Sequence, residues 1–200
     1  MNTKGHWDSI YRSKSDDEMS WTQPGPLMSL KLIGEVCYSG RVIDVGGGTS
    51  GLAEKLLDRG YEVTVMDISE AALERSRVRL GAKANHIHWI AADVSTGPSL
   101  ETFDVWHDRA VFHFLTAPGD RAAYKKLLLQ TVLVGGHAVI GSFALDGPPK
   151  CSGLEVQRYD GPSLAVELGS QFTLLKSEPE IHVTPWGKQQ SFQFSLFRRV

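Results

Sequence analysis

The sequence predicts an α/β fold in which helices cover both faces of a mostly parallel, doubly wound sheet. Three observations lead to this expectation. From Arg41 onward, apolar runs of strand length alternate with segments of helical period, which is the pattern of βαβ units. The runs are apolar almost throughout, as parallel strands that are buried on both faces require. A run of glycines separates the first strand from the helix that follows it.

Each element is placed by its own local signals. We expect strands at 41–45, 62–66, 87–91, 103–106 and 137–143, and helices at 50–59, 69–80 and 120–133. Ser69 is a suitable N-cap for the helix at 69–80, and Gly81 ends it. A short helix at 162–168 and β segments at 173–183 and 191–198 follow. Two late strands after five α/β units predict an antiparallel hairpin at the edge of the sheet.

About 40 residues precede the first strand, and they contain a predicted helix at 27–36 and an aromatic-rich segment with Trp7, Tyr11 and Trp21. Ligands bind at the carboxyl ends of the strands in open α/β sheets. We therefore interpret this segment as a flap over those ends. The expected organisation is one domain, with a helical flap at 1–40, a cofactor-binding core at 41–145, and a substrate loop with the C-terminal hairpin at 146–200.

Length, composition and charge define the class of protein. A chain of 200 residues with 42% hydrophobic and 22% charged residues is typical of one globular domain. A net charge of −2 provides no global attraction to nucleic acid or to an anionic membrane. Neither a signal peptide nor an apolar run of about 20 residues is visible, and only two cysteines are present. We expect a cytoplasmic protein, a monomer or weak homodimer, with neither nucleic acid nor membrane as partner.

The glycine run predicts a nucleotide-binding turn. Gly46, Gly47 and Gly48 lie between a strand and a helix, where a backbone without Cβ atoms turns tightly and approaches a ligand closely. The spacing of Gly46, Gly48 and Gly51 also satisfies the G-x-G-x-x-G pattern of dinucleotide-binding enzymes. The turn alone therefore does not identify the nucleotide.

Three carboxylates at successive strand ends narrow the choice. Asp44 lies in the first strand just before the glycines, where it is placed to accept hydrogen bonds from a cationic amino group. Asp67 ends the second strand, where a carboxylate can hold both hydroxyls of a ribose. Asp93 ends the third strand and can accept from the exocyclic amine of adenine. Together they predict a ligand with an amino group, a ribose and an adenine.

This constellation resembles the class I S-adenosylmethionine-dependent methyltransferases. The matching segments are 42–48, 63–69, 92–94 and 103–108, within a resemblance that spans about 41–143. It implies a Rossmann-like, three-layer fold with seven strands, S-adenosyl-L-methionine as the cofactor and S-adenosyl-L-homocysteine as the product. Ser50 stands where the family often has glycine, which leaves the local shape of the turn open.

The resemblance also implies roles for the site residues. Asp44 and the glycines at 46–48 would hold the methionine end of the cofactor, Asp67 the ribose, and Asp93 with Val94 the adenine. His107 would lie beside the methionine portion. Cofactor-binding residues expected in addition are Trp21 and Ile68.

The segment 106–115 follows the fourth strand and is expected to face the methyl acceptor. It lacks the Asn/Asp-Pro-Pro-Tyr/Phe motif of methyltransferases that act on amide or base nitrogens, which argues against nucleic-acid and glutamine acceptors. An Asp-Arg pair followed by small and apolar residues is diffusely similar to small-molecule thiol methyltransferases of the thiopurine type. We expect a small-molecule acceptor, preferably a thiol or another small sulfur species.

Three residues of this segment are candidates for catalysis. Asp108 and Arg109 are expected at the methyl face, where Arg109 would hold an anionic nucleophile or lower its pKa by charge. His113 would act as a base. The alternatives are that Arg109 only pairs with Asp108 or Asp104 and that His113 is a core histidine. Residues expected to bind the substrate are Trp7, Tyr11, Arg109, Cys151 and Trp186.

Other functions and ligands remain open or are argued against. A protein lysine N-methyltransferase is an alternative, because the segments 7–11 and 18–21 also resemble that group and Asp108 would receive the lysine. A non-catalytic nucleotide-sensing or NAD-binding protein is a third possibility. No metal site is expected, because His86 and His88 share one strand face without a third ligand at suitable spacing.

Overall fold

Seven strands form one sheet in the computed structural model, which describes residues 3–200. The parallel strands are β1 (Arg41–Val45), β2 (Glu62–Asp67), β3 (Ile87–Ala91), β4 (Phe103–Arg109) and β5 (Val132–Phe143). The antiparallel strands are β8 (Phe172–Val183) and β9 (Gln189–Arg199). The strand order β3-β2-β1-β4-β5-β9-β8 confirms the predicted doubly wound sheet with a late antiparallel hairpin at its edge.

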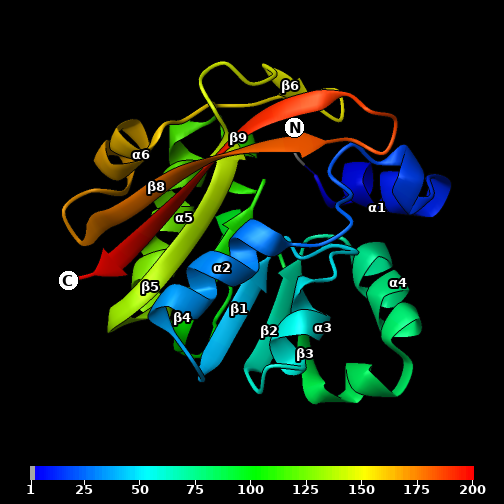
Figure 1. Ribbon diagram of the computed structural model, residues 1–200, viewed down its shortest axis with the longest axis horizontal. Coiled ribbons are helices and arrows are strands. Elements are labelled where there is room, and N and C mark those ends of the chain that lie inside the picture. The colour runs from blue at the N-terminus through cyan, green and yellow to red at the C-terminus, as the bar shows by residue number, and fades with distance from the viewer. Residues whose placement is uncertain (1–2) are drawn as a thin grey trace.

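Helices cover both faces of this sheet and produce two apolar cores (Figure 1). On one face, Val42 and Val63 pack with α2 (Leu27–Val36), α3 (Leu52–Leu57) and α4 (Glu70–Leu80). On the other face, Ile43 and Trp106 pack with α5 (Pro118–Thr131) and α6 (Gly161–Leu168). Side chains of a strand alternate between faces, so continuously apolar strands serve both cores. This is the predicted three-layer arrangement.

Most element boundaries agree with the local signals. Ser69 accepts a hydrogen bond from the Ala72 N–H at 3.2 Å, and Gly81 ends α4 with φ +55°. Helix α3 is shorter than the predicted 50–59, because Ser50 belongs to the glycine turn, where its N–H donates to the Gly47 carbonyl at 2.9 Å. Strand β4 is longer than the predicted 103–106 and continues to Arg109. Its last three residues are polar, and the sequence pattern there does not indicate a strand.

The helical flap contains, besides the predicted helix at 27–36, a helix for which no separate range was predicted. Helix α1 (Lys4–Ser13) packs against α4 at the carboxyl edge of the sheet and buries Trp7 and Tyr11 (Figure 1). Short 3₁₀ turns follow strands and helices: η1 (Asp16–Glu18), η2 (Gly81–His86), η3 (Val94–Thr96) and η4 (Phe112–Phe114). The first two residues of the predicted flap lie outside the described residues.

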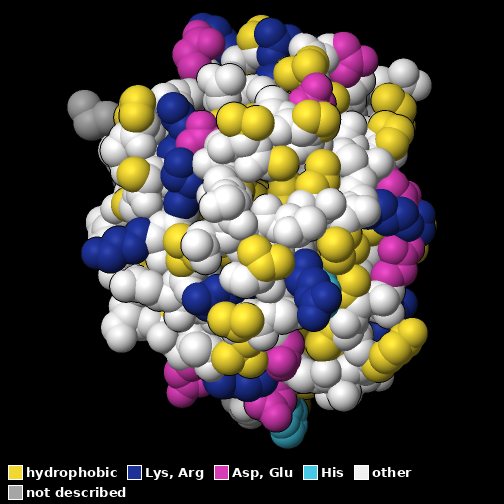
Figure 2. Space-filling model, turned by 90° about the vertical axis from the view of Figure 1, so that its left-hand side faces the viewer, with side chains coloured by type: hydrophobic (Ala, Val, Ile, Leu, Met, Phe, Trp, Pro, Cys, Tyr) yellow, Lys and Arg dark blue, Asp and Glu magenta, His cyan; other side chains and the backbone are white. Residues whose placement is uncertain are grey.

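The C-terminal part adds a loop and an exposed sheet edge. The loop after β5 contains a two-strand pair, β6 (Lys150–Cys151) and β7 (Leu154–Glu155). Figure 2 shows the side on which α6 and the C-terminus lie, where charges of both signs are mixed with scattered hydrophobic groups. None of the helices in the described part is both long and apolar enough to cross a bilayer.

Candidate active site

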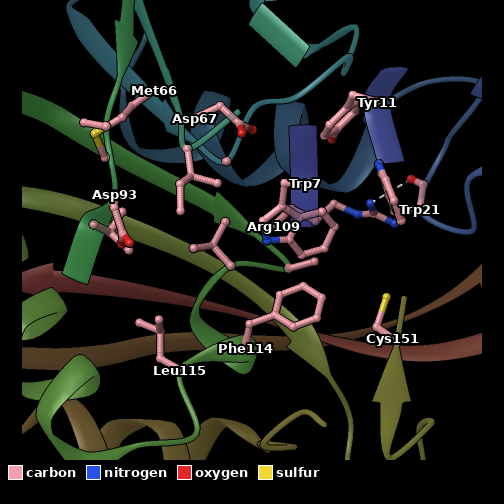
Figure 3. Close-up of a pocket in the computed structure, with 16 residues that line it drawn as sticks. Trp7, Tyr11, Trp21, Met66, Asp67, Asp93, Arg109, Phe114, Leu115 and Cys151 are labelled. Carbon is pink, nitrogen blue, oxygen red and sulfur yellow. Dashed lines mark hydrogen bonds between the residues drawn. The ribbon is translucent and has the colours of Figure 1, made fainter. Parts of the chain in front are cut away.

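Two cavities lie side by side at the carboxyl edge of the sheet. The first is lined by residues that follow β2, β3 and β4, and by the flap (Figure 3): Trp7, Tyr11, Trp21, Gly46, Met66, Asp67, Ile68, Ala92, Asp93, Val94, Arg109, Ala110, Val111, Phe114, Leu115 and Cys151. The second is lined around the glycine turn by Tyr11, Trp21, Thr22, Gln23, Pro26, Ser29, Asp44, Gly46, Gly47, Thr49, Ser50, Gly51, His107 and Arg109. Tyr11, Trp21, Gly46 and Arg109 line both, so the cavities are neighbouring parts of one elongated site.

The glycine turn leaves no room for side chains. Gly46 and Gly48 have φ of +66° and +51°, a region that favours glycine. A Cβ on Gly46 would collide with the Val111 side chain, and one on Gly48 with the Tyr11 hydroxyl. A Cβ on Gly47 would lie 2.7 Å from Val65 and 2.9 Å from an oxygen of Asp44. The bare backbone is therefore required by both conformation and space.

Asp67 lies at the end of β2 and lines the first cavity. Its carboxylate accepts hydrogen bonds from the Gly48 N–H at 2.9 Å and the Ser69 N–H at 2.8 Å. Burial raises the pKa of Asp67 to about 6, although these two N–H groups favour the charged form. The carboxylate is thus tied to the glycine turn and is close to losing its charge in mildly acidic conditions.

Asp93 has a capping role as well as a place in the first cavity. Its Oδ1 accepts from the Ser95 N–H at 2.8 Å and from the Ser95 hydroxyl at 2.7 Å, and it is the N-cap of η3. Val94 and Ile68 line the same cavity. The structure therefore brings together the polar and apolar residues that the sequence places after β2 and β3.

Asp44 is held by a buried chain of three side chains in the second cavity. His107 Nδ1 lies 2.7 Å from Asp44 Oδ1, and His107 Nε2 lies 2.9 Å from the Ser29 hydroxyl. All three residues are buried. Asp44 Oδ2 is buried and has no hydrogen-bond partner among residues 3–200. This oxygen therefore lacks a donor among the described residues, and its residue lines the second cavity.

Arg109 lies between the two cavities and lines both. One guanidinium nitrogen donates to the Trp21 carbonyl at 3.0 Å, as Figure 3 shows, and the group lies over the Phe192 ring at 4.6 Å. Its Nε and its second terminal nitrogen are buried and unpaired within the described chain. Burial lowers the pKa of Arg109 to about 10, and the opposing charge of Glu180 partly offsets this effect. The largely desolvated guanidinium of Arg109 therefore has N–H groups that can donate to a ligand.

Side chains from the body of the domain fix the flap over the cavities. His182 lies with Nε2 2.6 Å from the Ser20 carbonyl, and Gln23 donates to Glu180 at 2.9 Å. At its other end, Asp8 accepts from the Ser69 hydroxyl at 2.7 Å. The aromatic residues expected in the site, Trp7, Tyr11 and Trp21, all line the first cavity.

Asp108 does not face either cavity. It is fully buried, and its two oxygens accept from the Val111 and Phe112 N–H groups at 2.8 and 3.0 Å and from the Tyr124 hydroxyl at 2.7 Å. Burial raises the pKa of Asp108 to about 6. Its acceptor sites are taken up in shaping the turn after β4. This position does not fit the expected role at the methyl face.

His113 is a core histidine in the structure, which is the second of its two sequence interpretations. The side chain is fully buried between Phe114 and Phe143, and Nδ1 accepts from the Phe143 N–H at 3.2 Å. Burial first, and the charge of Arg109 second, lower the pKa of His113 to about 3. A residue that is absent from both cavities and so weakly basic does not fit the role of a base.

The two remaining predicted substrate-binding residues have different positions. Cys151 is buried and lines the first cavity, and burial raises the pKa of its thiol. Trp186 is 55% exposed in the turn between β8 and β9 and lines neither cavity. The prediction for Trp186 rests on a diffuse resemblance, and the hairpin directs this residue to solvent instead.

Sequence reasoning missed several residues of the site. Ser29 and Gln23 reach the second cavity from the flap, and Glu180 reaches the flap from β8. These contacts join segments far apart in the chain, for which the sequence offers no local signal. Ala110 lies in the first cavity with φ +71°, an uncommon value for a residue other than glycine. Such strain is often found at functional sites. The only sequence signal for it is the small side chain that follows Arg109.

Comparisons with known proteins agree on the type of domain. Residues 42–131 match the family model described as a methyltransferase domain. Nodulation protein S of Rhizobium tropici is 34% identical over 103 residues, which cover 50% of this chain and 42% of that protein. Malonyl-[acyl-carrier protein] O-methyltransferase of Anoxybacillus flavithermus is 35% identical over 80 residues, or 38% of this chain and 30% of that protein. The chain thus spans less than half the length of the curated relatives it matches.

Solved structures share the fold over nearly the whole chain. The N-methyltransferase NodS from Bradyrhizobium japonicum WM9, in complex with S-adenosyl-L-homocysteine, aligns with a TM-score of 0.74, 18% identity, and 100% and 99% of the two chains. A structure from work on the conversion of a disulfide bond into a thioacetal group during echinomycin biosynthesis aligns with a TM-score of 0.79, 23% identity, and 98% and 93% coverage. At these identities the likeness establishes the fold.

Proposed function

We propose that this chain is a class I S-adenosylmethionine-dependent methyltransferase that transfers a methyl group from this cofactor to a small-molecule acceptor. The match to a methyltransferase domain over residues 42–131 and the fold shared with NodS support this proposal. The family uses S-adenosyl-L-methionine, and S-adenosyl-L-homocysteine is its product. The observation that carries the proposal is the pair of cavities, which place a free carboxylate oxygen, a bare glycine turn and Asp67 along one elongated site.

The residues present fit the cofactor on three observations. Asp44 Oδ2 is buried and unpaired in the described structure, as an acceptor for an ammonium group would be before ligand binding. The glycine turn excludes Cβ atoms next to the same cavity. Asp67 and Asp93 line the first cavity, with apolar Ile68 and Val94 beside them. We assign the amino-acid end to Asp44, the ribose to Asp67, and the adenine to Asp93 and Val94.

The bound cofactor supplies an electrophilic methyl group on a sulfonium. The task of the protein is to align the acceptor with this group and to exclude water. Trp7, Phe114 and Leu115 make the first cavity largely apolar, and the flap covers it. Contacts of the flap with β8 hold this cover in place. Alignment in a dry cavity is therefore the main contribution that these residues make.

Arg109 is the residue that we assign to the acceptor. Its unpaired N–H groups would bind an anionic reacting atom, and its charge lowers the pKa of an acidic group nearby. A thiol needs little beyond deprotonation, so a small sulfur acceptor suits a cavity whose lining includes neither histidine nor lysine. One fold neighbour is described by a conversion at sulfur, from a disulfide bond to a thioacetal group. We therefore prefer a thiol or another small sulfur species.

A nitrogen acceptor is the second candidate for the same site. Two fold neighbours are described as N-methyltransferases: NodS, and the 1,6-didemethyltoxoflavin-N1-methyltransferase of Burkholderia thailandensis with bound 1,6-didemethyltoxoflavin. The charge of Arg109 would also favour an amine in its neutral, nucleophilic form. The alternative of a protein lysine acceptor loses one of its two supports, because Asp108, expected to receive the lysine, is fully buried and lines neither cavity.

The test is release of S-adenosyl-L-homocysteine by the full chain with sulfide, small thiols, small amines and a protein lysate as acceptors. We expect turnover with thiols and a fall in kcat/KM of at least about tenfold in Arg109→Gln. Arg12→Gln, at an exposed arginine, is the matched control. Turnover with amines alone would show that the acceptor atom is nitrogen and not sulfur. Turnover with the lysate alone would refute a small-molecule acceptor.

A further inference from the structure

The chain of side chains Ser29–His107–Asp44 connects three elements around the second cavity. Ser29 lies in the first turn of α2, His107 near the end of β4, and Asp44 in β1 just before the glycine turn. The two contacts, 2.9 Å and 2.7 Å, leave both ring nitrogens of His107 occupied. Since β1 and β4 are paired with Asp44 opposite His107, the backbone fixes this histidine beside the carboxylate.

The direction of the hydrogen bonds follows from the chemistry of the groups. An ionised carboxylate only accepts, so His107 donates from Nδ1 to Asp44 Oδ1. In a neutral imidazole Nε2 is then the acceptor, and the Ser29 hydroxyl donates to it. Each donor thus has one acceptor, and the orientation of the carboxylate is set by groups outside the cavity.

The hydrogen bonds between Ser29, His107 and Asp44 leave one carboxylate oxygen of Asp44 without a partner in the described structure. Asp44 Oδ2 has no partner among the described residues, although it is buried and the residue lines the second cavity. An arrangement that only stabilised the fold would have no reason to leave an anionic oxygen without a donor, because that costs free energy. Asp44 interacts electrostatically with Arg109 and Asp67, from β4 and β2.

We propose that Ser29 and His107 are positioning residues that hold Asp44 Oδ2 toward the second cavity, so that the site selects adenosyl ligands that carry an α-amino-acid end over nucleosides that lack it. The inference rests on the proposed function, because the ligand occupies the same two cavities. Asp44 in β1 contacts the ligand, and Ser29 in α2 and His107 in β4 determine the selectivity by orienting its carboxylate. The first cavity, which has separate residues around Asp67 and Asp93, does not depend on them.

Two ligands separate this role from a structural one. S-adenosyl-L-homocysteine has the amino-acid end, and 5′-methylthioadenosine keeps the adenosine and the sulfur but lacks that end. Titration calorimetry of the full chain with each ligand gives the ratio of the two dissociation constants. In His107→Phe we expect the dissociation constant for S-adenosyl-L-homocysteine to rise about tenfold or more, as loss of an oriented, charge-assisted contact implies. That for 5′-methylthioadenosine should stay within about twofold.

Conservative variants make the test specific. The side chain of Asn has an N–H group near the position of Nδ1, so His107→Asn should restore most of the ratio. Ser29→Ala removes only the outer hydrogen bond and should raise the dissociation constant for S-adenosyl-L-homocysteine by about threefold. If His107→Phe does not fold, the same titrations with Ser29→Ala test the inference. Equal weakening of both ligands, or no change for either, would overturn the inference. Failure of the unmodified protein to bind either ligand would instead overturn the proposed function.

Discussion

Burial gives similar pKa values to two carboxylates that have very different surroundings. Burial raises the pKa of Asp67 and that of Asp108 to about 6 in each case. Asp108 has three protein donors and faces neither cavity, whereas Asp67 has two N–H donors and lines the first cavity. A raised pKa alone therefore does not identify a ligand-binding carboxylate, and the cavity decides between the two.

Ligand binding should depend on pH through Asp67. The ionised carboxylate is a stronger acceptor for ribose hydroxyls than the protonated acid, so affinity for S-adenosyl-L-homocysteine should fall as the pH is lowered through about 6, near the raised pKa. Hydroxyl donors favour the charged form, so binding near this pH should release a proton. Calorimetry in buffers of different ionisation enthalpy measures both effects. An affinity that is constant between about pH 7.5 and 5, or the same pH dependence in Asp67→Ala, would contradict the assignment.

The same carboxylates affect stability with the opposite sign. The pKa of Asp67 and that of Asp108 are higher in the folded chain than the ordinary 3.8. Their contribution to stability is therefore complete below about pH 4 and is lost as the pH rises through about 6. Ionised Asp67 is thus a cost to the fold, which the proposed hydrogen bonds from ribose hydroxyls would offset.

At the scale of elements, the flap and the strand β4 show where local patterns stop being informative. Trp7, Ile10 and Tyr11 have the i, i+3, i+4 spacing of an amphipathic helix in α1, but this pattern does not say what the apolar face packs against. The segment is a helix here because Trp7 and Tyr11 are buried against the domain. Strand β4 continues through three polar residues because His107 and Asp108 find buried hydrogen-bond partners. Both outcomes depend on tertiary contacts, which a local pattern does not contain.

The docking of α1 should depend on Asp8. This carboxylate accepts from the Ser69 hydroxyl and the Ala71 N–H, at 2.7 and 3.3 Å. Although burial opposes it, hydrogen bonds from Lys4, Ser69 and Ala71 lower the pKa of Asp8 to about 2. The contact is therefore complete above about pH 4 and is lost as the pH falls toward 2.

In Asp8→Ala, hydrogen exchange of the amides in α1 should be at least about tenfold faster, because the helix opens locally more often. Exchange in the central strands β1 and β4 should not change. Asp17→Ala, at an exposed carboxylate of the same segment, is the control and should leave α1 as in the unmodified chain. If α1 exchanged at the same rate in both variants, the flap would be held by its aromatic side chains and not by Asp8.

At the scale of the whole molecule, the parallel sheet follows from patterns that the sequence states directly. Continuously apolar strands predict burial on both faces, and Val42 and Ile43 do serve the two opposite cores. The glycine turn and the carboxylates after successive strands predict the carboxyl edge of the sheet as the site, since parallel strands bring their ends together. Asp67 and Asp93 line the first cavity, and Asp44 lines the second.

Long-range partners were not predictable in the same way. Ser29, Gln23 and Glu180 join the site through contacts between the flap, β8 and β4. No local signal specifies such pairs, because the partners lie far apart in the sequence and the periodicity of helices or strands does not relate them. The roles given to Asp108, His113 and Trp186 rested on position in a segment, and burial or exposure of each side chain decides otherwise.

The central claim is that one adenosyl amino acid occupies both cavities, and calorimetric titration of the full chain tests it most directly. S-adenosyl-L-homocysteine should bind at one site with a dissociation constant in about the micromolar range. NAD⁺, which also suits a glycine-rich turn, should show no binding under the same conditions. Heat with NAD⁺ and none with S-adenosyl-L-homocysteine at about 1 mM ligand would contradict the account.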